Sequence, residues 1–271
     1  MNNIQKLIIL SLLAISGLAW ILSFVTTDTM MNTMIMTVDY NLLNISLFTV
    51  IWTSGMIAMM FPAIIPMILL YNKIIIQKDK SETILITKEN KVEYSLKTIL
   101  FTSTYIIVWT IVGLILYFGW SLYVNNFIVN FFSDDKINIL FGIILIISGI
   151  YQFTSLKRKC IGYCESPLAF FTKRWHNGTI GVIKMGTYHG LYCLGCCWPY
   201  FLLMVALGWM NIAWMGLFAG IIFGEKIWSK GIWISRFIGI AFAIVGILTV
   251  LGIITLYNDT MDMNMNAMDM S

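Results

Sequence analysis

Charged side chains are scarce in this sequence, and their scarcity excludes a water-soluble globule. Only 11% of the 271 residues are charged while 59% are hydrophobic, and the mean hydropathy is +0.84. A chain of this composition cannot cover itself with the polar surface that a soluble domain presents to water. We therefore expect an integral protein of the cell membrane, all-α in class, folded as a polytopic bundle of transmembrane helices in the lipid bilayer.

Motifs of hydrolytic and nucleotide chemistry are also missing. The sequence has no Gly-rich phosphate loop, no His-Glu-x2-His helix and no Ser-centred nucleophile elbow. Its one adjacent pair of carboxylates, Asp134 and Asp135, falls on a predicted external turn. An enzyme is therefore not expected, and the net charge of +4 is explained by membrane topology rather than by nucleic-acid binding.

Long apolar runs, by contrast, are abundant. A spanning helix needs about 20 mostly apolar residues, and seven runs are candidates: 4–24, 45–70, 98–120, 137–153, 191–207, 212–223 and 234–257. The sixth run is short, which leaves six spans as the alternative. Because no clear small-residue cleavage site follows Phe24, we expect the first run to be a retained anchor rather than a cleaved signal peptide.

Basic residues set the expected orientation, because Lys and Arg close to spans stay on the cytoplasmic side. With seven spans and a cytoplasmic N-terminus, only Lys136 of the 17 basic residues falls outside, and the C-terminus is external. We predict one transmembrane domain over 1–257, with cytoplasmic loops at about 72–97 and 155–184. A Met- and Asp-rich external tail, 258–271, is expected to be disordered.

Three of the five cysteines stand together with one of the two histidines in the segment His189-Gly-Leu-Tyr-Cys-Leu-Gly-Cys-Cys197. If this segment is helical, His189, Cys193, Cys196 and Cys197 project from neighbouring turns of one face. The segment opens a long apolar run that begins at Trp198. This pattern predicts a soft-metal or thiol-redox site at a membrane boundary.

The other two cysteines, Cys160 and Cys164, are four residues apart, on one helical turn or in a loop that folds back towards Cys193. All five cysteines are predicted on the cytoplasmic side, where thiols stay reduced and structural disulfides are rare. A metal site or a catalytic redox pair is therefore favoured over a crosslink. The alternative is that these cysteines are small hydrophobic residues of the core.

Methionine favours one metal over the others. Soft thiolates select Cu(I), zinc or an iron–sulfur cluster, and neither zinc-finger modules nor a regular set of four cysteines are present. Thioether sulfur binds Cu(I) but competes poorly for zinc, so we expect copper and regard zinc as less favoured. Met56, Met59 and Met60 share one helical face of the second run, where they form a waypoint for Cu(I) or fill the core flexibly.

Two further Met-rich segments lie on the predicted outer side. One is the external loop 26–44, with Met30, Met31, Met34 and Met36. The other is the tail segment 261–270, which holds five Met and two Asp residues. The tail resembles the extracellular Met-rich segments of high-affinity copper importers, and compositional drift is the alternative explanation.

A set of motifs carries a resemblance to a known family. The chain resembles the predicted metal-binding integral membrane proteins of bacteria and archaea, sometimes labelled copper chaperones, over roughly residues 45–255. The motifs are Trp52-x3-Met-x2-Met-Met-x-Pro-x3-Pro66, Leu156-Lys-Arg-Lys-Cys-x3-Cys-x-Ser-Pro167, Gly186-x2-His-Gly-Leu-Tyr-Cys-Leu-Gly-Cys-Cys-Trp198, Met210-Asn-x2-Trp-Met215 and Glu225-Lys226. The resemblance implies metal binding at six residues: Cys160, Cys164, His189, Cys193, Cys196 and Cys197.

The leading functional hypothesis is an integral membrane protein that handles Cu(I), by transport or by delivery to a membrane copper enzyme or copper carrier. One alternative is a membrane thiol-disulfide exchange protein that uses Cys160 and Cys164 against Cys196 and Cys197. Another is an accessory or assembly subunit of a membrane copper enzyme. Glu225, beside Lys226, is read most simply as half of a solvated ion pair at the cytoplasmic boundary, and otherwise as part of an ion pathway or metal surroundings.

Overall fold

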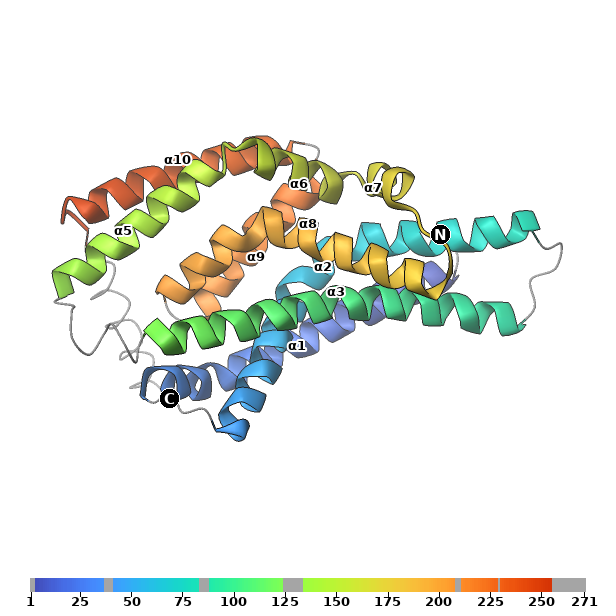
Figure 1. The fold of residues 1–271 in the computed structure, drawn as a ribbon, viewed down its shortest axis with the longest axis horizontal. Helices are drawn as coiled ribbons and strands as arrows, with labels where there is room; N and C mark the ends of the chain where they lie inside the picture. Colours follow the sequence, from blue (N-terminus) through green and yellow to red (C-terminus); the bar gives the residue numbers. More distant parts are fainter. Residues whose placement is uncertain are drawn as a thin grey trace.

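The computed structural model describes residues 3–36, 41–82, 88–123, 134–207, 211–228 and 230–254, and within them it contains helices and no strand. The expected all-α class is therefore confirmed. The helices, shown in Figure 1, are α1 (Asn3–Met36), α2 (Leu42–Glu82), α3 (Lys88–Tyr123), α5 (Asp134–Tyr151), α6 (Ser155–Glu165), α7 (Pro167–Arg174), α8 (Gly178–Leu207), α9 (Ile212–Ile227) and α10 (Gly231–Val250).

Four of these helices are long and apolar enough to cross a membrane: Gln5–Thr26 in α1, Leu42–Gln77 in α2, Val92–Gly119 in α3 and Gly231–Val250, which is α10. The pair α5 and α6, bent by 66° at a short break, would add a fifth. Large apolar side chains such as Leu18, Ile115 and Phe237 are exposed on their outer faces. Such faces are compatible with lipid around the bundle.

The predicted fifth and sixth spans, 191–207 and 212–223, fall within α8 and α9. Neither helix meets the length and hydropathy of the other candidates within the described residues, because α9 has only 16 residues and α8 mixes polar and aromatic side chains into its apolar run. The predicted count of seven spans stays a prediction. Both helices lie in the middle of the molecule, with α5 and α10 on one side and α1 to α3 on the other (Figure 1).

Several expected loops are helical. The helix α1 continues to Met36 through most of the predicted external loop 26–44, and α2 and α3 extend into the predicted loop 72–97. The predicted loop 155–184 contains α6, α7 and the first turns of α8. The loops are predicted as segments outside the membrane, and helical structure within them leaves that prediction open. In 72–97 and 155–184, Lys, Glu and Gln are good helix formers, so a helix can continue past the point where hydrophobicity falls.

Two local features position the later helices. Pro62 and Pro66 both lie inside α2, which changes direction along its length in Figure 1, as expected where proline removes a backbone hydrogen bond. The helix α6 begins after the break that follows α5, where the Thr154 side chain caps it by accepting a hydrogen bond from the Lys157 N–H. This sharp turn lays α6 against α8 and α9.

Candidate metal centre

The central helix α8 carries the motif with the largest number of soft side chains. His189, Cys193, Cys196 and Cys197 are all buried on it, and the segment is helical as expected. Because α8 begins at Gly178, these residues lie in the middle of a 30-residue helix rather than at its start. Neighbouring helices enclose the site, and its expected position at a membrane boundary stays a prediction.

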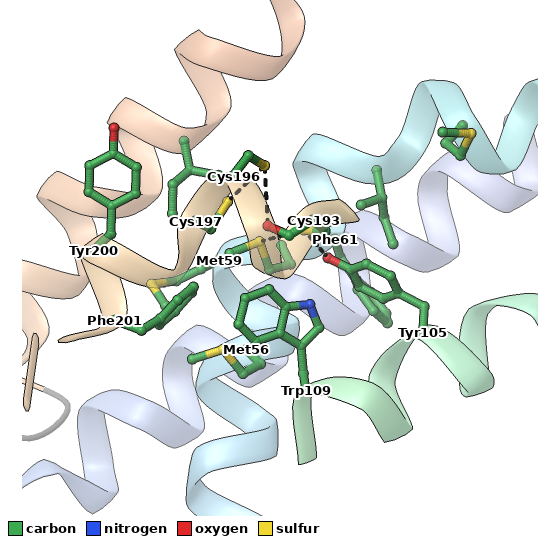
Figure 2. Close-up of a cluster of buried hydrophobic side chains, with 14 of the residues drawn as sticks. Met56, Met59, Phe61, Tyr105, Trp109, Cys193, Cys196, Cys197, Tyr200 and Phe201 are labelled. Carbon is green, nitrogen blue, oxygen red and sulfur yellow. Dashed lines mark hydrogen bonds between the residues drawn. The ribbon is translucent and has the colours of Figure 1, made fainter. Parts of the chain in front are cut away.

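Sulfur atoms from three helices approach one another here. The Sγ atoms of Cys196 and Cys197, both labelled in Figure 2, are 3.4 Å apart. The Sγ of Cys164, on α6, is 3.8 Å from that of Cys196. The Sδ of Met60, on α2, is 4.0 Å from the Sγ of Cys193. Two sulfurs that share a tetrahedral ion at about 2.3 Å each lie about 3.8 Å apart, so these pairs have the spacing of shared ligands.

The fifth cysteine, Cys160, is buried where α6 crosses α8. Its Sγ lies 2.7 Å from the position that a Cβ would take on Gly195, so any side chain at position 195 would force α6 away. The spacing of four residues had predicted that Cys160 and Cys164 share one helical turn, and α6 confirms it. The two thiols nevertheless differ, because Cys164 is partly exposed and Cys160 is buried.

Met56, Met59 and Met60, on α2, are all buried in the central cluster of side chains, together with Trp52. The thioether of Met60 contacts the thiol of Cys193, whereas Met56 and Met59 lie nearby in the same cluster (Figure 2). The helical face expected for these methionines is therefore turned towards α8. The side chains of the Met-rich segment 27–40 and of the tail 258–271 lie outside the described residues.

A lysine that the sequence placed in solvent reaches the same sulfur atoms. The Nζ of Lys226, on α9, is 2.9 Å from the Sγ of Cys193 and 3.6 Å from the Sδ of Met60, and the residue is only 6% exposed. The hydroxyl of Tyr105, on α3, is 3.0 Å from the same Cys193 Sγ. The Cys193 sulfur is thus surrounded by an ammonium group, a phenol and a thioether.

Glu225 is buried as well, at 1% exposure. The sequence predicts that it forms a solvated ion pair beside Lys226. Its carboxylate forms an ion pair with Lys157 at 2.9 Å and accepts a hydrogen bond from the Tyr200 hydroxyl at 2.5 Å. The Lys157 Nζ also donates to the Cys196 carbonyl oxygen at 2.6 Å. The prediction of a solvated ion pair was wrong. Adjacent helical residues point roughly 100° apart, so Glu225 meets Lys157 of α6 while Lys226 meets Cys193 of α8.

His189 has an unusual environment for a polar side chain. It is 3% exposed, and its ring stacks against Tyr105 and Phe101 with centroid distances of 5.1 and 5.9 Å. Neither ring nitrogen has a hydrogen-bond partner within the part of the chain that the structure describes. A buried imidazole without partners is costly. Its nitrogens are available to a ligand.

The arrangement is pairwise rather than convergent. Among the described residues, no three His, Cys, Asp or Glu side chains meet at one position that could hold a metal ion. The sulfurs of Cys193 and Met60 contact the Lys226 ammonium instead. All five cysteines are free thiols, so no disulfide constrains the site.

A buried cluster of sulfur atoms inside a helical bundle is typical of proteins that bind soft metals or use thiols. Comparison with known families separates these two classes. Residues 49–249 match the model of a family described as copper chaperone (PpoB2). The match covers most of the chain, and the chain therefore belongs to this copper chaperone family. No curated protein and no solved structure matches it. All five cysteines, His189, Met56, Met59 and Met60 fall within the matched region.

Proposed function

We propose that this protein is a multi-pass membrane chaperone for Cu(I), holding the ion with the thiols of Cys193, Cys196 and Cys197 and the thioether of Met60. The observation that carries the proposal is the buried cluster of sulfur atoms from α2, α6 and α8, with contacts of 3.4 to 4.0 Å. Membership of the copper chaperone family supports it independently.

The chemistry of the available donors favours Cu(I) over harder metals. Thiolates and thioethers are soft ligands that suit Cu(I), whereas carboxylates suit magnesium, calcium and manganese. The buried carboxylate nearby, that of Glu225, is already occupied by Lys157 and Tyr200. His189 offers a further nitrogen donor one helical turn from Cys193, with both ring nitrogens unpartnered in the described residues.

Lys226 gives the thiols a counter-charge. A buried thiolate without compensation would be strongly unfavourable, and the ammonium of Lys226 lies 2.9 Å from the Cys193 sulfur. A monovalent copper ion bound to the same sulfur supplies the same positive charge. We infer that Cu(I) binding displaces the Lys226 ammonium from Cys193 and Met60 and that one proton leaves Lys226 or a copper-binding thiol, so that the net charge inside the bundle changes little between the two states.

The long apolar helices support placement in the cell membrane. We propose a cytoplasmic N-terminus and cysteines towards the cytoplasmic side from the distribution of Lys and Arg along the sequence. Delivery to a membrane copper enzyme or a copper carrier fits a chaperone better than bond-breaking chemistry does. The Met-rich segments 26–44 and 261–270 would collect the ion on the outer side. Met56 and Met59 would pass it towards Met60.

Metal analysis of the detergent-purified protein tests the proposal. We expect reconstitution with Cu(I) to give a defined copper content per chain, lowered by more than half in Cys193→Ser and Cys196→Ser. Met67→Leu, a buried methionine change elsewhere on α2, is the matched control and should leave the copper content unchanged. A wild-type protein that retains no Cu(I) would refute the proposed function.

A thiol-disulfide exchange protein is the second candidate, because the Cys164 and Cys196 sulfurs lie 3.8 Å apart in a chain whose cysteines are free. Closing that distance to a bond of about 2.0 Å needs only a modest movement of α6. Redox titration separates the two functions. Reversible formation of a Cys164–Cys196 disulfide that is indifferent to copper would favour exchange, and protection of both thiols by copper would favour the chaperone.

A further inference from the structure

Cys164 is the one cysteine that connects the sulfur cluster to the surface of the described structure. The other four cysteines are buried, whereas Cys164 is partly exposed. Its Sγ lies 3.8 Å from the buried Sγ of Cys196, which in turn lies 3.4 Å from that of Cys197. An ion held by the inner thiols is therefore one sulfur contact away from the surface.

The position of Cys164 is built into the fold. Lys157, seven residues earlier on α6, is completely buried and donates to both the Cys196 carbonyl and the Glu225 carboxylate. Cys160, between them in the sequence, packs on Gly195, where α6 and α8 approach closely. These contacts hold α6 in register with α8 and bring the Cys164 thiol to Cys196.

Two cations lie beside the sequence neighbour of Cys164. Tyr163 packs on Tyr192 with ring centroids 4.6 Å apart, the ammonium of Lys173 lies 5.7 Å from the Tyr163 ring, and Arg174 donates to the Tyr192 hydroxyl at 3.1 Å. We call Lys173 and Arg174, in the last turn of α7, the basic rim. A rim of this kind attracts a negatively charged partner and raises its rate of encounter.

We propose that Cys164 is the exchange thiol through which Cu(I) leaves the protein, and that the basic rim docks an acceptor protein with an acidic surface and its own sulfur ligand. The proposal rests on the proposed function and adds an exit and a partner to it. An acidic protein is favoured over the bilayer surface because the partly exposed Cys164 thiol, next in sequence to Tyr163, can exchange Cu(I) with the sulfur ligands of a protein but not with a lipid headgroup.

The exchange step balances without any change of oxidation state. The Cys164 thiol loses its proton as its sulfur bonds to Cu(I), the bond from Cu(I) to Cys196 breaks, and the Cys196 sulfur takes up a proton. Sulfur ligands of the acceptor then replace Cys164, Cys193, Cys197 and Met60 in turn, each acceptor thiol losing a proton and each released cysteine sulfur taking one up. Copper remains Cu(I) throughout, and each bond formed replaces a bond of the same kind.

The rate of copper release tests the role of Cys164. The full-length protein in detergent is loaded with Cu(I), and transfer to bathocuproine disulfonate, an anionic chelator that changes colour with Cu(I), is followed by stopped flow. Cys164→Ser should keep the wild-type copper content and release copper at least about tenfold more slowly, because the accessible exchanging sulfur is gone. Met67→Leu, a buried change of a sulfur-containing side chain on α2, is the matched control and should stay within about twofold of wild type.

Two outcomes would overturn the role of Cys164. Release from Cys164→Ser at the wild-type rate would show that copper leaves by another route. Loss of the bound copper itself in Cys164→Ser, with Met67→Leu unaffected and Cys164→Ala behaving identically, would make Cys164 a ligand of the holding site instead. A wild-type protein that binds no Cu(I) would instead overturn the proposed function, so the two failures are distinguishable.

The basic rim is tested with the double variant Lys173→Gln and Arg174→Gln. Transfer to the anionic chelator should slow about threefold at low salt and lose most of its salt dependence, while transfer to the uncharged thiol 2-mercaptoethanol should not change. If the variant transfers copper normally and loses only its binding to anionic phospholipid vesicles, the rim serves the bilayer surface, and the acidic partner is refuted.

Discussion

Two buried lysines contact α8 and have opposite surroundings. Lys157, from α6, meets a carboxylate and a carbonyl oxygen, with Tyr200 bonded to the same carboxylate. Lys226, from α9, meets the sulfurs of Cys193 and Met60. The first lysine has partners that satisfy it permanently, whereas the second faces atoms that are better ligands for a soft metal than for an ammonium. We infer that the first fixes the fold and the second belongs to the site.

The largest expected effect on stability is at Lys157, the lysine whose partners are oxygen atoms. Glu225→Leu should destabilise the protein by about 3–5 kcal/mol, because it leaves the Lys157 ammonium buried without its counter-charge. Thermal unfolding in detergent measures the change. The double variant Lys157→Met with Glu225→Leu should recover much of the loss, since no unpaired charge remains. A single variant as stable as wild type would show that Lys157 is not held as the structure has it.

A smaller effect on stability is expected at Lys226, the lysine that contacts sulfur atoms. Lys226→Met should cost about 1–2 kcal/mol of stability in the copper-free protein, because the partner it leaves behind, a thiolate, can take a proton and become neutral. Lys230→Met, an exposed lysine nearby, should change stability by less than about 0.5 kcal/mol. A loss as large as that of Glu225→Leu would remove the proposed distinction between the two lysines.

The smallest effect on stability, and the sharpest on copper, is expected at Met60. Met60→Leu conserves volume and should change stability by less than about 1.5 kcal/mol, while copper affinity, measured by competition with a Cu(I) chelator, falls severalfold. Lowering the pH should weaken copper binding in both proteins, because protons compete for the thiolates and not for the thioether. Unchanged affinity in Met60→Leu would exclude the thioether from the site.

Some of the site was predictable from the order of residues. The spacing of His189, Cys193, Cys196 and Cys197 predicted one helical face because the period of a helix, 3.6 residues, is a property of the backbone alone, and α8 bears it out. The helical class followed in the same way from long apolar runs. Met60 and Cys164, which are far apart in the chain, were predicted as site residues from their side-chain chemistry. The residues that they contact in space were not predicted.

The partners of the charged residues were not predictable. Lys157 and Lys226 were counted as topology signals on the cytoplasmic side, yet the structure buries both against α8. The available signal was an ionisable residue next to an apolar run, which marks a candidate functional group when it turns inward. Its direction depends on which helices pack together, and local sequence does not encode that.

Composition and periodicity by themselves determined that this protein is helical, rich in apolar surface and equipped with soft ligands along one face of a helix, because these properties arise within a single segment. Only the tertiary structure decided that Met60 and Lys226 meet at Cys193, that Lys157 pairs with Glu225, and that Cys164 borders the buried thiols. Those contacts join residues up to 166 positions apart, and they form only when separate helices pack into one core.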